Sequence, residues 1–157
     1  MTTSEATRYL EKYRHLKHKI TALENRLNAL TEKAMMGGGG IGDGERVQGG
    51  SPLTLEDIVC QKIDVENRYK EYISVAYKTL KEIEARLNET LDDKPLYYNI
   101  LTLYYIDEIS MLEISESLNY SINYVYVNRR KAIKTFANQM TVRKLEYSLN
   151  LFPKERS

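Results

Sequence analysis

The side chains best suited to catalysis or metal binding are few and scattered. His15 and His18 lie three residues apart with no third ligand near them in the sequence, so we interpret them as solvated helix surface. Cys60 is the only cysteine, and because no histidine follows residue 18 to activate it, we interpret it as an inert small side chain. Asp107 and Glu108 are adjacent and would point apart in a helix. We therefore expect no enzymatic activity, no catalytic or metal-binding residues and no cofactor.

The glycines are confined to one stretch. All eight lie between Gly37 and Gly50, and three of them fit the G-x-G-x-x-G pattern of dinucleotide sites. That pattern here follows an expected helix, whereas the dinucleotide site requires a strand before it and a βαβ unit around it. A P-loop is excluded because Gly44-Glu45-Arg46 replaces its Gly-Lys-Ser/Thr. We interpret residues 37–50 as a flexible linker, long enough to let the chain turn back on itself.

Positive charge is concentrated in the C-terminal part of the chain. No Asp or Glu occurs from Ser117 to Leu145, whereas six Lys and Arg do. The formal net charge of the whole chain is only +1, so a nucleic-acid role must come from this local charge. If about six cations met phosphates, log affinity would fall with log salt at a slope near −5.

The residues around the start of this basic stretch have the spacing of a helix-turn-helix. Such a motif needs a small residue where the helices touch, a residue tolerating left-handed backbone four positions later, and an apolar residue six positions further on. Ser115, Asn119 and Val125 have these spacings, and Asn accepts positive φ readily. We expect the flanking residues Ile114, Leu118 and Tyr120 to be buried.

Three short helices are expected to form one small core around this motif. Ser121 would cap the second helix of the motif, and the segment Leu96 to Ile106 would form a third helix. This arrangement is the minimal tri-helical DNA-binding unit. The expected core residues are Leu101, Tyr104, Tyr105, Val125, Ala132 and Phe136.

The exposed N-terminal part of the second helix would supply the DNA contacts. Asn can pair with adenine, Arg with guanine, and Tyr or Val can touch a thymine methyl group. Basic side chains further along would meet phosphates. The predicted DNA-binding residues are Ser121, Asn123, Tyr124, Tyr126, Val127, Arg129, Arg130, Lys131 and Lys134.

The first 36 residues have the pattern of a long coiled-coil helix. Apolar residues recur with alternating spacings of four and three, which is a heptad seam. Charges at the flanking positions do not specify how such a helix would pair with a second copy of itself. The seam consists of Tyr9, Tyr13, Leu16, Ile20, Leu23, Leu27, Leu30 and Ala34.

A second long helix is expected over residues 51–91. It would begin either at Ser51-Pro52 or at Thr54, which with Asp57 resembles a capping box. This helix is acidic overall and the first is basic, so we favour their pairing as an antiparallel hairpin, with an intermolecular coiled coil as the alternative. Residues 95–152 would then form the DNA-binding domain, in which residues after Asn138 either extend the recognition helix or fold back as a fourth one.

These elements predict an all-α protein. The longest nearly apolar run, Tyr97 to Ile106, is about half of what spans a bilayer, so we expect no membrane association. A single cysteine and the absence of an apolar signal core fit a cytoplasmic protein.

Residues 101–136, LTLYYIDEISMLEISESLNYSINYVYVNRRKAIKTF, resemble region 4 of sigma-70-type factors. Glu113-Ile114-Ser115 stands where that family carries Glu-Ile-Ala, and Leu118-Asn119-Tyr120-Ser121 where it carries Leu-Gly-x-Ser. The whole chain is similar in plan to phage-encoded regulators of the ArpU and RinA type. The resemblance implies promoter or operator binding in phage transcription inside a bacterial host cell, with contact to RNA polymerase. Asn128 and Arg129 depart from the family pattern, and no region 2 equivalent is visible.

Two other functions remain open. A small-terminase-like packaging protein also joins a helix-turn-helix to an oligomerising helical region, although there the DNA-binding unit usually comes first. A protein-interaction module could use the same helices, with tyrosines as anchors, since tyrosine is enriched at interfaces. For the regulator we expect double-stranded DNA as a partner and a homo-oligomer, with a dimer favoured because dimers read paired half-sites.

Overall fold

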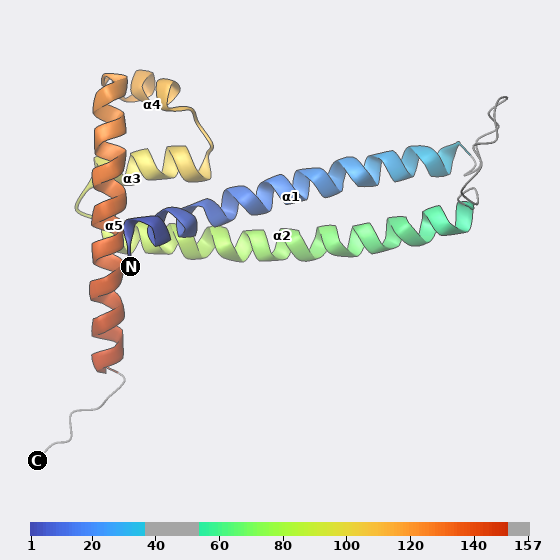
Figure 1. Ribbon diagram of the computed structural model, residues 1–157, viewed down its shortest axis with the longest axis horizontal. Coiled ribbons are helices and arrows are strands. Elements are labelled where there is room, and N and C mark those ends of the chain that lie inside the picture. The colour runs from blue at the N-terminus through green and yellow to red at the C-terminus, as the bar shows by residue number, and fades with distance from the viewer. Residues whose placement is uncertain (37–53, 151–157) are drawn as a thin grey trace, which may run out of the picture. The chain divides into compact units, whose positions relative to one another are not determined.

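The computed structural model describes residues 1–36 and 54–150, with side chains up to residue 144 (Figure 1). Its elements are α1 (Thr3–Met35), α2 (Leu55–Leu91), α3 (Pro95–Leu101), a π-helical turn η1 (Thr102–Ile106), α4 (Met111–Leu118) and α5 (Ile122–Asn150). The predicted all-α class, with a long N-terminal helix, is confirmed. The predicted linker 37–50 and Ser51-Pro52 lie outside the described residues. Among the described residues, no helix is long and apolar enough to cross a membrane.

The chain divides into two compact units. One holds Met1–His15 with Tyr77–Ser157, and we call its described part the head unit. The other holds Leu16–Ala76, and we call its described part the hairpin unit. The two long helices α1 and α2 each contribute one segment to each unit.

The hairpin unit consists of two helical segments that lie side by side (Figure 1). Leu30 of α1 packs with Ile58 and Val65 of α2, and these three side chains are buried. In this unit the predicted seam residues Leu16, Ile20, Leu23, Leu27, Leu30 and Ala34 are all buried or half-buried. The heptad pattern therefore identifies the face of α1 that turns toward α2.

The start of α2 is fixed by a reciprocal cap. The backbone N–H of Asp57 donates to Thr54 Oγ1 at 3.1 Å, and the backbone N–H of Thr54 donates to Asp57 Oδ2 at 3.2 Å. These bonds satisfy N–H groups that the first turn of a helix leaves without partners. Hydrogen bonds from the Thr54 hydroxyl and backbone lower the pKa of the Asp57 carboxyl.

The head unit has a larger core than the three-helix core expected from the sequence. Leu10 of α1 and Leu87 of α2 are fully buried in the same cluster as Phe136 of α5. Leu10 falls outside the predicted heptad seam and is nevertheless buried, because α1 here contacts α5 as well as α2. The ring of Tyr9 stacks on Phe136 with centroids 6.0 Å apart. The first turns of α1 and the last turns of α2 thus share one core with α3, η1 and α5.

The Tyr9 hydroxyl also ties α1 to α2 within the head unit. It donates to Glu82 Oε1 at 3.0 Å. Burial raises the pKa of Tyr9, and the hydrogen bond to Glu82 raises it further. This hydroxyl therefore stays protonated and remains a donor across the physiological pH range.

A π-helical turn ends the helix that begins at Pro95. The N–H of Asp107 donates to the carbonyl of Thr102 at 3.1 Å, five residues back, where an α-helix would use the residue four back. The chain then reverses through Glu108, whose φ of 56° lies in the left-handed region. This turn carries Tyr105 and Ile106 into the core and leaves Tyr104 half-buried beside it.

Candidate nucleic-acid interface

Helix α4 opens the helix-turn-helix with a second capping box. The N–H of Glu113 donates to Ser110 Oγ at 3.3 Å, and the N–H of Ser110 donates to Glu113 Oε2 at 3.1 Å. Hydrogen bonds from the Ser110 side chain and then its backbone lower the pKa of the Glu113 carboxyl. The cap fixes where α4 begins and hence the position of the turn that follows it.

The turn has the backbone that the sequence predicts. Asn119 adopts φ 58° and ψ 40°, which is the left-handed conformation. Ser115 is buried where α4 meets its neighbours, and its carbonyl accepts from the N–H of Tyr120 at 3.0 Å. Ser121 accepts a hydrogen bond from the N–H of Tyr124 at 3.2 Å and so caps α5. Val125 is fully buried.

Tyr120 is a correction to the predicted core. It was expected to be buried, but 44% of its surface is exposed. Its ring instead packs on Tyr124, with centroids 4.6 Å apart. The left-handed turn at Asn119 directs the next residue outward, so this aromatic pair lies on the surface of the motif.

One face of α5 is buried along the head unit. Val125 packs with Ile100, Met111 and Ile114 in one cluster, whereas the predicted core residues Ala132 and Phe136 lie in the cluster shared with α1 and α2. The α5 helix continues without interruption to Asn150, so the described residues after Asn138 extend α5 rather than fold back as a fourth helix.

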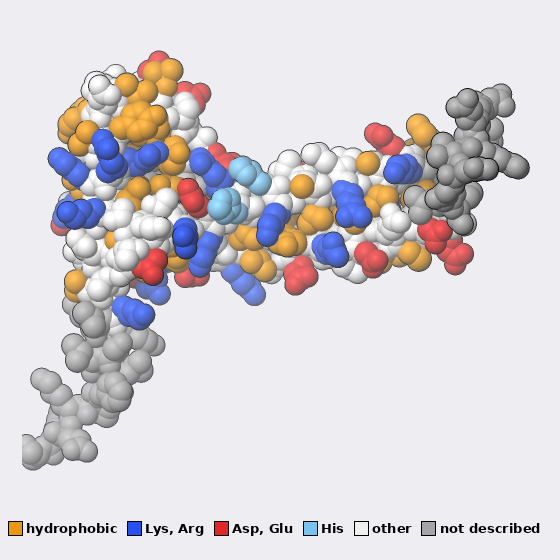
Figure 2. Space-filling model, in the orientation of Figure 1, with side chains coloured by type: hydrophobic (Ala, Val, Ile, Leu, Met, Phe, Trp, Pro, Cys, Tyr) orange, Lys and Arg blue, Asp and Glu red, His pale blue; other side chains and the backbone are white. Residues whose placement is uncertain are grey.

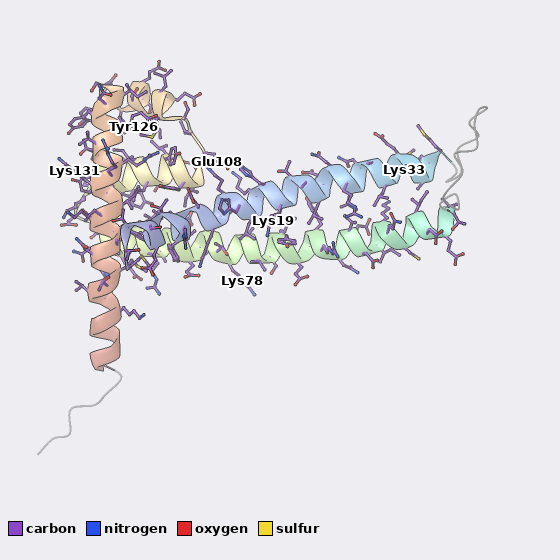
Figure 3. All side chains as sticks on the ribbon, in the orientation of Figure 1. Lys19, Lys33, Lys78, Glu108, Tyr126 and Lys131 are labelled. Atoms are coloured by element: carbon purple, nitrogen blue, oxygen red, sulfur yellow. The ribbon has the colours of Figure 1, made fainter. Side chains whose placement is uncertain are left out.

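The opposite face of α5 carries four of the predicted DNA-binding residues in one row. Asn123, Val127, Arg130 and Lys134 are spaced by four, three and four residues, and all four are exposed. We call this row the α5 outer stripe. Tyr124 and Lys131 lie beside it and are also exposed, and Lys131 projects outward from α5 (Figure 3).

The basic side chains of this face are not neutralised by the protein. Figure 2 shows Lys and Arg side chains gathered over α5. Within the residues that the structure describes, no salt bridge engages Arg130, Lys131 or Lys134. Because no acidic residue occurs from Ser117 to Leu145, the face keeps its positive charge.

Arg129 differs from its basic neighbours. Its guanidinium lies 4.6 Å from the centroid of the Tyr104 ring and 5.5 Å from that of Tyr126, close enough for cation–π attraction. Its Nε is buried and has no hydrogen-bond partner. Arg129 is one of the predicted DNA contacts, and in this position its guanidinium supports Tyr126, whose ring lies at the edge of the exposed face.

Asn128 is likewise part of the fold rather than of the exposed face. It is buried, and its side-chain amide donates to the carbonyl of Tyr124 at 2.8 Å. Arg143, one of the six cations in the basic stretch, donates a hydrogen bond to the carbonyl of Glu89 on α2. Only part of the basic stretch therefore faces outward.

Sequence reasoning missed Arg14, which joins α1 to η1 and to the turn that follows it. Its Nη2 donates to the carbonyl of Tyr104 at 2.9 Å, and its Nε lies 3.3 Å from Glu108 Oε1. Its guanidinium is also 4.9 Å from the centroid of the Tyr104 ring, so this ring attracts both Arg14 and Arg129. No local pattern marks Arg14, because its partners are about 90 residues away in the chain.

Comparisons with known proteins place the chain in a family. No curated protein and no solved structure matches the chain. Residues 41–137 match the profile of a family described as "Protein of unknown function (DUF1492)". The matched range contains α2, α3, α4 and the start of α5, including the α5 outer stripe. Since this range exceeds half of the 157 residues, the chain belongs to the DUF1492 family.

Proposed function

We propose that this protein is a sequence-specific DNA-binding transcriptional regulator that inserts the start of α5 into the major groove of double-stranded DNA. The proposal agrees with the resemblance of residues 101–136 to sigma-70 region 4. That resemblance further suggests a phage regulator that acts in the bacterial cytoplasm and contacts RNA polymerase.

The α5 outer stripe is the observation that carries the proposal. It combines residues that can read bases, Asn123, Val127 and Arg130, with Lys134, which can meet a phosphate, on one exposed face. The stripe begins directly after a capped helix start and a left-handed turn, as a recognition helix requires. A basic surface that served only to interact with solvent would not require the left-handed turn at Asn119 or the cap at Ser121.

The structure lowers the number of phosphate contacts expected from the sequence. Of the six cations, Arg129 is engaged by two tyrosine rings, Arg143 by the Glu89 carbonyl, and Lys144 also interacts within the chain. Arg130, Lys131 and Lys134 remain as exposed cations at the start of α5. Three neutralised phosphates give a log–log salt slope of about −3 rather than −5. A measured slope near −5 would require contacts from outside the α5 outer stripe and its neighbour Lys131.

The test is a competition gel shift with fragments of the source genome, repeated at two salt concentrations. Selective retention of an intergenic fragment, weakened by salt, would support the proposal. Uniform retention would instead favour packaging, for which light scattering should find a ring-sized oligomer. Failure to bind any duplex at low salt, together with capture of polymerase, would favour the protein-interaction module.

Two variants that each remove one cation test the assigned face. Arg130→Ala should weaken specific binding by about 1–3 kcal/mol, because a bidentate contact to guanine is worth that much. The matched control is Lys81→Ala, which removes an exposed cation from α2 and should leave DNA affinity unchanged. Circular dichroism must show unchanged helicity in both. Undiminished binding by Arg130→Ala would contradict the assignment of α5 as the recognition helix.

A further inference from the structure

The hairpin unit leaves a row of large apolar side chains in solvent. Leu55, Val59, Ile63 and Ile73 of α2 are each more than 40% exposed, although all are apolar. At 100° per residue, these four positions fall within a sector of about 80° on α2. We call this sector the α2 exposed stripe.

Two charged residues complete the stripe between its apolar ends. At the same helical rotation, Glu66 and Lys70 are the only other positions of the sector between residues 55 and 73. They are four residues apart, yet no salt bridge between them is present in this described part of α2. Both charges are therefore available to a partner that lies along the stripe.

The central four residues of the stripe are arranged symmetrically about residue 68. Ile63 and Ile73 are each five positions from it, and Glu66 and Lys70 are each two positions from it. When two copies of one helix pair antiparallel about a twofold axis at this level, each residue faces its mirror position in the other copy. Ile63 then faces Ile73 of the second copy, and Glu66 faces Lys70, so the central part of the stripe is complementary to itself. Val59 falls opposite Tyr77, and Leu55 opposite Lys81, of the second copy.

The small core of the hairpin unit gives such pairing a physical cause. Its core is a cluster of three buried side chains, and structures of this size seldom bury enough apolar surface to be stable alone. A second copy over the α2 exposed stripe would cover the apolar residues that the hairpin cannot bury. A parallel arrangement would set Glu66 against Glu66 and Lys70 against Lys70, which is repulsive.

We propose that the α2 exposed stripe is the surface through which two copies of this chain associate, with their α2 helices antiparallel about residue 68. This proposal is independent of DNA binding. It assigns a surface to the homo-oligomer expected from the sequence.

Charge reversal tests the pairing, with sedimentation equilibrium of the full chain in the absence of DNA. The unchanged chain should be a dimer. Glu66→Lys places like charges against Lys70 twice in each dimer, and Lys70→Glu does the same against Glu66, so each variant should dissociate at least about tenfold more readily. An equal mixture of the two variants restores both attractive contacts and should recover the dimer.

Control variants separate this effect from a general change of charge or folding. Asp64→Lys makes the same charge change on α2 outside the stripe and should remain dimeric. Ile63→Glu should be monomeric because it places a carboxylate in the apolar contact. All variants should keep the helicity of the unchanged chain by circular dichroism.

Three results would overturn the proposal. The first is an unchanged chain that is monomeric at every concentration tested. The second is a dimer that persists in Glu66→Lys, Lys70→Glu and Ile63→Glu alike, since the contact would then lie elsewhere. The third is a mixture of the two charge variants that stays monomeric, because recovery follows directly from the antiparallel pairing.

Discussion

The head unit and the hairpin unit are both helical, but they are stabilised to different degrees. In the head unit, twelve buried side chains from α1, α2, α3, η1 and α5 form one cluster, and a second cluster lies between α3, α4 and α5. In the hairpin unit, three buried side chains from two helical segments form the core. The free energy of unfolding from apolar burial should therefore be concentrated in the head unit.

This difference between the units shows that the number of helices that pack against a helix, rather than its length, determines how many of its side chains are buried. A helix between several neighbours can bury residues on much of its circumference, as α5 does with Val125, Ile133 and Ala137. A helix with one neighbour can bury only one stripe. The hairpin unit consequently keeps apolar side chains exposed, whereas α5 in the head unit is packed against several segments on one side.

Matched leucine truncations should give the largest effects and test this comparison. Leu87→Ala in the head unit removes a fully buried side chain and should cost about 3–5 kcal/mol, because close-packed surroundings cannot refill the cavity. Leu30→Ala in the hairpin unit should cost about 2 kcal/mol, because two helices with solvent on both sides can close the gap more easily. Urea unfolding followed by circular dichroism measures both changes.

DNA binding gives the same pair of variants a second readout. At temperatures where both variants are folded, Leu30→Ala should keep the DNA affinity of the unchanged chain, since the α5 outer stripe belongs to the head unit. Equal losses of unfolding free energy in the two variants would contradict the unequal stabilisation of the units.

Arg14 provides an intermediate effect within the head unit. Arg14→Ala removes a hydrogen bond to the Tyr104 carbonyl, an ion pair with Glu108 and a cation–π contact. A loss of about 1–2 kcal/mol is expected, since all these contacts are partly shielded from solvent. Thermal unfolding measures the loss, with Arg8→Ala on the exposed surface of α1 as the control. Equal stability of the two variants would show that the contacts of Arg14 add nothing measurable to the stability of the head unit.

The sequence predicted the local features of the fold well. The left-handed turn at Asn119 follows from a residue type that accepts positive φ, and the cap at Ser121 from a hydroxyl that can accept a backbone hydrogen bond. The start of α2 at Thr54, one of the two alternatives, could also be predicted from the sequence because its partner Asp57 is only three residues away. Each of these features depends on neighbours within one or two helical turns.

The features that the sequence did not predict depend on distant neighbours. Leu10 is buried and Arg129 is held by two tyrosine rings because α1, η1 and α5 meet in the head unit, and no local period encodes that meeting. Tyr120 is the opposite case. Its hydrophobic character predicted burial, but the turn directs its side chain outward. The sequence therefore predicted the helix that carries the candidate residues, but which of them lie on its buried and exposed faces required the structure.

The smallest expected effect is a change in the stability of the first helical turn at each capping box. One box lies in each unit, so the effect can be compared between the two units. The pKa values of Asp57 in the hairpin unit and Glu113 in the head unit are lowered from ordinary values of 3.8 and 4.5, by hydrogen bonds from Thr54 and Ser110 respectively. A carboxyl whose pKa is lower in the folded chain contributes stability above its ordinary pKa, and this contribution is lost as pH falls through the folded value.

Acid should therefore loosen the first turns of both α2 and α4, but α2 more, because a smaller core supports it. Amide hydrogen exchange at Asp57 and Glu113, followed from neutral pH downward, measures the difference. Glu113→Gln is the control, since glutamine can still accept the Ser110 hydrogen bond but does not titrate in this range. If the α2 amide stayed as well protected as the α4 amide below pH 3.8, the hairpin unit would have to be held by more than its own core, as pairing along the α2 exposed stripe would provide.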